Sequence, residues 1–216
     1  MIRFYGYFRS SAAWRCRIAL NLKGVQTEFI PVHLRRGGGE QRQPAYRERN
    51  PQGLVPLLED GDFRLSQSLA IIEWLEECYP EPPLLPAGPR DRARVRAFAQ
   101  SIACDIHPLQ NLRVLEYLRG ELAQDDDGVS AWCRRWIGEG LRACETLLAQ
   151  DQHGGAYAFG AAPGLADICL VPQVFSARRF GVDLASMPTI GRIVAACEEL
   201  EAFAAAHPSR QPDAEQ

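Results

Sequence analysis

Two adjacent serines, Ser10 and Ser11, stand where a short apolar strand is predicted to run into a helix. The two residues that follow are alanines, so no other side-chain hydroxyl or thiol stands directly beside the pair. A serine at the start of a helix caps it by accepting a hydrogen bond from a backbone N–H group of the first turn. Because one hydroxyl is enough for the cap, the pair leaves a second hydroxyl for another purpose.

A second polar pair, Gln67 and Ser68, stands at the predicted start of a later helix. The first N–H groups of a helix have no partner within it, and they form the positive end of its dipole. Ser68 could therefore bind a carboxylate at this place. The alternative is that one of the two residues only caps the helix.

Between these pairs, Pro56 interrupts the apolar run LVPLL at residues 54–58. Proline cannot donate a hydrogen bond within a sheet, so it belongs at an edge or before a bend. The Val55–Pro56 bond is a candidate for the cis form. The simple interpretation is an edge strand, and the functional one is an open backbone edge at Val55 that could pair with a peptide-like ligand.

The elements that would position these residues follow in the order β-α-β-α-β-β-α over about 80 residues. Predicted strands cover residues 1–7, 27–33, 54–58 and 62–66, and predicted helices cover residues 11–23, 40–48 and 67–79. Asp60-Gly61 lies between two apolar runs, which is a strong hairpin signal, and Gly24 suits the position that ends a helix. This order predicts a mixed four-stranded sheet in the thioredoxin-like arrangement.

Five prolines within residues 80–90 form a stiff connector that cannot be helical. We therefore predict a first domain over residues 1–80, a linker over 81–89 and an all-helical second domain over 90–216. Helical spacing of apolar residues predicts helices at about 90–107, 109–123, 129–150, 165–179 and 188–205. The last dozen residues are expected to be frayed.

The composition, 46% apolar and 24% charged with a net charge of -3, is that of an ordinary soluble globular protein. The sequence contains no basic stripe that would indicate a nucleic-acid partner. It also contains no run of about 18 apolar residues that would indicate a membrane span. The N-terminal residues lack the features of a signal peptide. Seven cysteines, odd in number and without a C-x-x-C pair, favour a reducing, cytoplasmic protein with no disulfide framework and no zinc or other metal site.

Five motifs follow one another along the chain. The first part contains F-R-S-S-x-x-W-R-x-R-I-A-L from residue 8, N-P-x-x-x-V-P-x-L at 50–58 and Q-S-x-A-I-I-E-W-L-E at 67–76. The second part contains C-D-I-H-P-L-Q-N-L-R-V-L at 104–115 and L-A-D-x-x-L-V-P-Q-V at 165–174. In these motifs the chain resembles the zeta-class glutathione transferases over nearly its whole length. The resemblance implies an N-terminal thioredoxin-like domain, a C-terminal helical bundle, glutathione as the cofactor and a homodimer.

The resemblance further implies that Ser10, with Ser11 in support, donates a hydrogen bond to the glutathione thiolate. Many members of the family have a cysteine where Ala12 stands, and any role of that cysteine cannot operate here. Cys16 is no substitute, because it lies about one helical turn further on and is expected to face the sheet.

Other glutathione contacts are implied in the same way. Val55, ahead of Pro56, would pair with the cysteinyl backbone. Gln67 and Ser68 would hold the γ-glutamyl carboxylate, and Gln41 would lie near the glycyl end.

The implied substrate is a small dicarboxylate, so its site needs cations. Arg9 directly precedes the serine pair and is expected beside the sulfur as a catalytic residue. Arg179 matches a family arginine that reaches the substrate site from the second domain, and Arg113 and His107, which follow the H-P-L-Q-N-L-R pattern, are further candidates. Arginine suits such roles through its bidentate geometry. A surface or interdomain ion pair is the alternative for each, and for His107 a further alternative is that it helps to end a helix, because it precedes a proline.

The implied reaction is cis–trans isomerisation of a C=C bond conjugated to carbonyls. Addition of a thiolate makes that bond single, rotation follows, and the thiolate leaves unchanged. The leading hypothesis is conversion of maleylacetoacetate to fumarylacetoacetate. Isomerisation of maleylpyruvate, general glutathione conjugation and a non-catalytic glutathione-binding scaffold remain alternatives.

Overall fold

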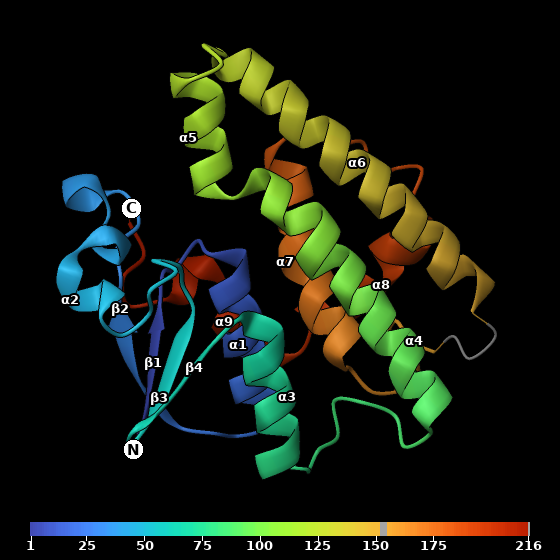
Figure 1. Cartoon of the computed structure of the whole chain (residues 1–216). Helices are drawn as coiled ribbons and strands as arrows, with labels where there is room; N and C mark the ends of the chain where they lie inside the picture. Colours follow the sequence, from blue (N-terminus) through green and yellow to red (C-terminus); the bar gives the residue numbers. More distant parts are fainter. Residues whose placement is uncertain (152–154, 216) are drawn as a thin grey trace. The chain divides into compact units, whose positions relative to one another are not determined.

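The computed structural model describes residues 1–151 and 155–215, and the chain forms two compact units (Figure 1). The first unit comprises Met1–Leu84 together with Leu200–Gln216, and the second comprises Leu85–Glu199. The boundary falls within the proline-rich connector. The sequence places everything from residue 90 in one helical domain, whereas the structure groups the chain from Leu200 onwards with the first unit.

A mixed four-stranded sheet forms the centre of the first unit, as predicted, with the strand order β2-β1-β3-β4. The strands are β1 (Ile2–Gly6), β2 (Thr27–Pro31), β3 (Leu57–Asp60) and β4 (Phe63–Ser66). β1 runs parallel to β2, and the other neighbours are antiparallel. The predicted hairpin is confirmed: Asp60 pairs with Phe63, and Gly61 in the loop has a φ of 62°, which glycine adopts without a steric penalty.

Helices cover both sides of this sheet. In Figure 1, α1 (Ser11–Leu22) and α3 (Ser68–Cys78) lie on one side of the sheet, and α2 (Pro44–Arg47) lies on the other. α9 (Glu201–Ala206) packs against α1. The first helix ends as predicted, because Gly24 has a φ of 65°.

The helix predicted at residues 40–48 is broken in two. A 3-10 turn at Glu40–Arg42 precedes α2, and another 3-10 turn covers Arg36–Gly38. Gln43 between the turn and α2 is extended, with a ψ of 145°. The physical reason is Pro44, because the ring of a proline disfavours the helical conformation of the residue before it.

The expected fraying of the C-terminal residues is wrong. A 3-10 turn at Pro208–Arg210 follows α9. Beyond it, the backbone N–H of Phe8 donates to Asp213 Oδ2 at 2.9 Å, and His33 Nε2 lies 2.8 Å from Glu215 Oε1. The tail is therefore tied to the first unit through partners far away in the sequence, which polar composition alone does not indicate.

The second unit is helical, as predicted. Its α-helices are α4 (Pro89–Gln100), α5 (Leu112–Gly120), α6 (Asp126–Gln150), α7 (Leu165–Arg179) and α8 (Pro188–Glu198). A π-helix (Ser101–Ile106) and a 3-10 helix (His107–Gln110) join α4 to α5. α7 packs against α4, α6 and α8, and every residue from 165 to 174 is buried.

The helix predicted at residues 188–205 is interrupted, because α8 ends at Glu198 and α9 begins at Glu201. Leu200 between them is extended, with a ψ of 130°, and it is the residue at which the chain passes to the first unit. In the described ranges, no helix is both long and apolar enough to cross a bilayer.

A buried carboxylate on β3 holds three strands together. Glu59 is 2% exposed, and its cross-strand neighbours are Arg3 on β1 and Arg64 on β4. Its oxygens accept hydrogen bonds from the Tyr5 hydroxyl at 2.8 Å and from Arg49 Nη1 at 2.8 Å. Burial by itself raises the pKa of Glu59, but the hydrogen bonds from Tyr5 and Arg49 outweigh it, so the pKa lies below its usual value.

The Glu59→Gln variant tests how much this charge contributes to stability, because glutamine has nearly the same shape as glutamate but carries no charge. We expect the free energy of unfolding near neutral pH to fall by about 1–3 kcal/mol. The pKa of Glu59 is lower in the folded state than in the unfolded state. The stabilisation is therefore present above the unfolded pKa and is lost as the pH falls through the folded pKa.

Urea unfolding of both proteins at a series of pH values measures this difference. Glu28→Gln, which changes an exposed glutamate on β2, is the matched control. A difference between wild type and Glu59→Gln that stays constant on acidification would contradict the assignment.

Candidate functional site

Three segments that the sequence marked for binding leave the sheet at the same edge. Tyr5 on β1 lies opposite Leu57 on β3, and Leu57 lies opposite Ser66 on β4. Directly beyond this row of the sheet come residues 7–11, residues 55–56 and residues 67–68. Because neighbouring strands lie only about 5 Å apart, the register brings these segments together without any contribution from the second unit.

Ser10 caps α1 and still has a hydrogen to donate. Its backbone is extended, with φ of -71° and ψ of 115°, and its Oγ accepts the N–H of Ala13 at 3.2 Å. A hydroxyl can accept one hydrogen bond and donate another at the same time. One serine can therefore cap the helix and also donate to an anion, and the half-buried Ser11 begins the helix beside it.

Ser68 begins α3 and is held from behind by α1. Arg15 Nη1 donates to Ser68 Oγ at 3.2 Å, and the Cys16 thiol donates to the Ser68 carbonyl at 3.7 Å. Arg15 is only 1% exposed, so a buried positive charge lies behind the N-terminus of α3. Because Ser68 Oγ accepts from Arg15, its own hydrogen is left for another acceptor. Sequence reasoning did not assign Arg15, although the W-R-x-R motif contains it.

Cys16 cannot serve as a nucleophile at this edge. It is 0% exposed, and its thiol is directed at the Ser68 carbonyl. The serine hydroxyls are thus the groups that α1 offers here.

Gln67 holds an unusual backbone conformation for a residue other than glycine. Its φ is 73° and its ψ is 116°, which costs about 1–3 kcal/mol and is typical of binding sites. Its side chain does not cap α3, and its Nε2 instead donates to Gln52 Oε1 at 2.9 Å. The first N–H groups of α3 therefore receive no cap from Gln67, as a carboxylate site at this place requires. Its contact with a carboxylate stays a prediction.

Val55 presents an open backbone edge. The Val55–Pro56 peptide bond is cis, which confirms the expectation. The carbonyl of Leu54 accepts hydrogen bonds from the Tyr46 hydroxyl and from Asn50 Nδ2, both at 2.7 Å. Within residues 1–151 and 155–215, the N–H and C=O of Val55 itself take part in no hydrogen bond. Tyr46 and Asn50 therefore support a strand end that is free to pair with a ligand.

Gln41 occupies a buried position on the loop after β2. It is 5% exposed, and its Nε2 donates to the Leu34 carbonyl at 3.2 Å. Its Oε1 is buried and has no hydrogen-bond partner among the described residues. The expected place of Gln41 near the glycyl end of glutathione stays a prediction, and its Nε2 group has a second hydrogen to donate.

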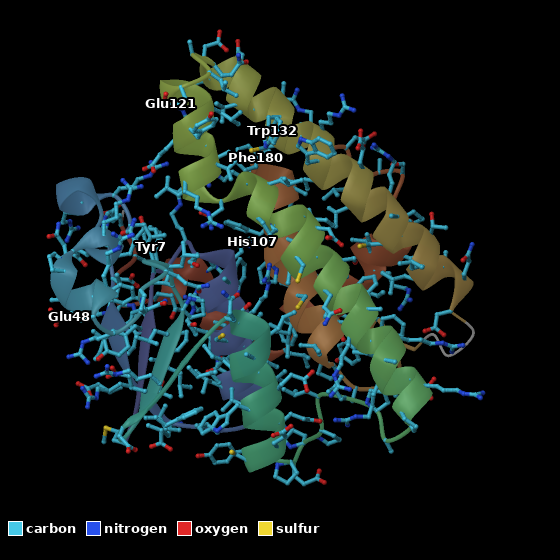
Figure 2. The ribbon with its side chains drawn as sticks, in the orientation of Figure 1. Tyr7, Glu48, His107, Glu121, Trp132 and Phe180 are labelled. Atoms are coloured by element: carbon cyan, nitrogen blue, oxygen red, sulfur yellow. The ribbon has the colours of Figure 1, made fainter. Side chains whose placement is uncertain are left out.

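The four cationic side chains that were predicted to bind the substrate are divided between the two units. Arg9 in the first unit is exposed, with its guanidinium carbon 6.0 Å from the centre of the Phe8 ring. In the second unit, Arg113 is exposed on α5, and Arg179 is the last residue of α7. His107 follows the π-helix and opens the 3-10 helix (Figure 2). Their roles in binding a substrate stay predictions.

The π-helix ahead of His107 was not predicted. Such a local widening of a helix is frequent at functional sites. No sequence signal within residues 101–106 distinguishes it from continued α-helix. Among the residues that the structure describes, no group of three or more His, Cys, Asp or Glu side chains could hold a metal ion, and all seven cysteines are free.

Comparison with known proteins gives concordant matches. Residues 4–83 match the family model of the glutathione S-transferase N-terminal domain. The chain is 49% identical to the maleylacetoacetate isomerase of Pseudomonas aeruginosa, over 98% of this chain and 98% of that protein.

Two solved structures are similar throughout. One is a holo structure of a maleylpyruvate isomerase, a bacterial zeta-class glutathione S-transferase. It has a TM-score of 0.96 and 52% identity, and the match covers 99% of this chain and 100% of that one. The other is the maleylacetoacetate isomerase of Methylobacterium extorquens AM1 with bound malonate and glutathione. It has a TM-score of 0.94 and 42% identity, with the same coverage of 99% and 100%.

The support of Val55 can be tested with Asn50→Ala, which removes one of the two hydrogen bonds to the Leu54 carbonyl. One neutral hydrogen bond contributes about 0.5–1.5 kcal/mol, so we expect the affinity for glutathione to fall about two- to tenfold. Titration calorimetry measures the affinity. Glu48→Ala, an exposed change two residues earlier (Figure 2), is the control. Equal affinities in the two variants would contradict the role of Asn50.

Proposed function

Because this chain belongs to the glutathione transferases, and within them to the zeta class, we propose that it is a glutathione-dependent cis–trans isomerase that converts maleylacetoacetate to fumarylacetoacetate. The observation that carries the proposal is the Ser10 hydroxyl, which caps α1 through its oxygen and keeps its hydrogen as a donor. A relative that is named for this reaction and is 49% identical over nearly the whole chain supports it.

The residues of the sheet edge fit glutathione. Val55 offers an unpaired N–H and C=O to the peptide backbone of the cofactor. The uncapped start of α3, with Ser68 in front of the buried Arg15, suits its γ-glutamyl carboxylate. We assign Gln67 to the same carboxylate and Gln41 to the glycyl end. These assignments rest on the family pattern together with the geometry of this edge.

When bound, glutathione supplies a thiolate that adds to the cis double bond, allows rotation about the resulting single bond and then leaves. The protein must keep that sulfur ionised near neutral pH, although a free thiol has a pKa of about 8.5. A hydrogen bond to a charged group contributes about 1.5–3 kcal/mol, which lowers the pKa by roughly one to two units. Ser10 donates this bond in our proposal, and the N-terminus of α1 adds about 0.3–1 kcal/mol.

The substrate brings two carboxylates, and charge develops on an enolate during the reaction. We assign Arg9, Arg113 and Arg179 to these charges, because guanidinium binds carboxylates bidentately and is always charged. His107 is a further candidate. In each case a loss of substrate affinity without loss of glutathione affinity, measured on the alanine variant, would support the assignment.

Maleylpyruvate is the second candidate substrate. The observation in its favour is the structural match, at 52% identity, to a zeta-class maleylpyruvate isomerase. The two substrates differ by a short acyl segment. Turnover of each, measured with purified protein, separates the two.

The catalytic assignment is tested with Ser10→Ala. We expect kcat to fall about tenfold to a hundredfold, and the pKa of the bound glutathione thiol to rise by about one to two units. Ultraviolet titration of the bound thiolate and isomerisation assays with both maleyl substrates, with and without glutathione, measure these changes. Ser11→Ala is the matched comparison and should have the smaller effect. Unchanged turnover and an unchanged thiol pKa in Ser10→Ala would refute the mechanism.

We propose that the protein is a homodimer, as family membership supports. An aromatic cluster on β4 and α3 gives further support. Phe63 is 43% exposed and its ring centre lies 5.8 Å from that of Trp74, while Tyr79 is 37% exposed and lies 6.3 Å from Trp74. Exposed aromatic groups of this kind are enriched at interfaces. Sedimentation equilibrium should give twice the 24.1 kDa mass of the chain, and a monomer at micromolar concentration would contradict the proposal.

A cytoplasmic location is also proposed. The seven free thiols support it, because free cysteines persist in reducing compartments.

A further inference from the structure

The loop that delivers Ser10 is a tight turn. Tyr7, labelled in Figure 2, follows β1, and its carbonyl accepts the N–H of Ser10 at 3.0 Å. Phe8 and Arg9 form the centre of this turn. Because Ser10 is both the last residue of the turn and the cap of α1, the position of its hydroxyl depends on how the peptide groups of Tyr7 and Phe8 are held.

Arg17 holds the carbonyl side of the turn. Its Nη1 donates to the Tyr7 carbonyl at 3.3 Å, and its Nη2 donates to the Phe8 carbonyl at 2.9 Å. Its Nε donates to the carbonyl of Ala206 in α9 at 3.2 Å. Arg17 is 6% exposed. Burial lowers its pKa to about 10 against the opposing effect of Asp213, so the guanidinium is charged at neutral pH and binds two successive carbonyls as a rigid fork.

Asp213 holds the other side of the same peptide segment. Its Oδ2 accepts the N–H of Phe8 at 2.9 Å. The N–H and the C=O of Phe8 are therefore both bound to charged side chains, two residues before Ser10. Hydrogen bonds to charged groups are about twice as strong as neutral ones. The Oδ1 atom of Asp213 is buried without a hydrogen-bond partner in the described parts of the chain, so this carboxylate is not simply a solvated surface charge.

The tail that carries Asp213 is fixed on both sides of it. Before it, Gln211 Nε2 donates to the Ala205 carbonyl at 2.9 Å. After it, Glu215 Oε1 lies 2.8 Å from His33 Nε2. The Arg36 N–H donates to His33 Nδ1 at 2.7 Å, which places the ring hydrogen of a neutral His33 on Nε2, facing Glu215. Contacts on both sides of Asp213 therefore hold it in place beside the turn.

We propose that Asp213 and Arg17 are positioning residues for Ser10: together they clamp the turn at residues 7–10, so the C-terminal tail sets the place of the hydroxyl that stabilises the thiolate. The inference rests on the proposed function of Ser10. A hydrogen bond to a thiolate weakens steeply with distance and angle, and a shift of about 1 Å in a catalytic group costs up to a hundredfold in rate. A clamp two residues from the hydroxyl acts directly on that distance.

Asp213→Ala and Asp213→Asn test the clamp. Alanine removes the acceptor for the Phe8 N–H, so we expect kcat to fall about tenfold and the pKa of the bound glutathione thiol to rise by about half a unit to one unit, with a smaller change in KM for glutathione. Asparagine keeps an acceptor oxygen and should restore most of both values. A purely structural role would not shift the thiol pKa of the folded protein.

Asp183→Ala is the matched control. Asp183 also accepts a backbone N–H, that of Ala185 at 2.9 Å, but it belongs to the second unit. Its removal should leave the thiol pKa unchanged. Urea unfolding of every variant identifies the conditions in which that variant is fully folded, and the assays are run in those conditions.

The double variant Ser10→Ala/Asp213→Ala separates the inference from the function on which it rests. If Asp213 acts through Ser10, the double variant should lose less than about twofold beyond Ser10→Ala alone. If Ser10→Ala itself changes nothing, the proposed mechanism fails. If Ser10→Ala impairs the enzyme while Asp213→Ala behaves as Asp183→Ala, or if the two losses multiply, the clamp is overturned.

Discussion

The hydroxyl of Ser10 is the group on which the rest of the site depends. Its oxygen accepts the Ala13 N–H and so starts α1, and this bond leaves the hydrogen available for an anion. The oxygen and the hydrogen of this one hydroxyl thus link the formation of α1 to the chemistry that we propose. Whatever moves the start of α1 also moves the donor, so a precise turn ahead of the helix is a requirement of function as well as of folding.

Buried cationic side chains of α1 hold this turn and a neighbouring segment in place. Arg15 reaches Ser68 at the start of α3, and Arg17 reaches the turn ahead of Ser10. Lys23 beyond its end donates to Glu76 Oε2 at 2.6 Å. Each buried cation would be costly alone, and each donates at least one hydrogen bond to a carbonyl, a hydroxyl or a carboxylate of another segment. One helix therefore holds two of the three segments that converge at this edge of the sheet, residues 7–11 and residues 67–68.

The expectations that the structure confirms rest on local chemistry. Glycine at φ of 65° ends α1 at Gly24, and Gly61 closes the hairpin, because only local sterics decide these positions. The expectation of a frayed tail failed because it depended on distant partners, whereas the helix predicted at residues 40–48 is broken for a local reason, Pro44. The tail predicted to fray is held by Phe8, which lies 205 residues from Asp213 in the sequence.

By itself, the sequence determined the order of the elements, the mixed sheet, the family and the residue types at the edge to which we assign glutathione. The elements and the sheet follow from periodicity and turn residues, and the family follows from the resemblance of the motifs, all of which are properties of short stretches of chain. Only the tertiary structure decided that Arg15 stands behind Ser68, that Asn50 supports Val55, and that Asp213 holds the turn before Ser10. The physical reason is that a buried polar group takes whichever partner the fold brings within about 3 Å, and that distance is set by packing rather than by neighbours along the chain.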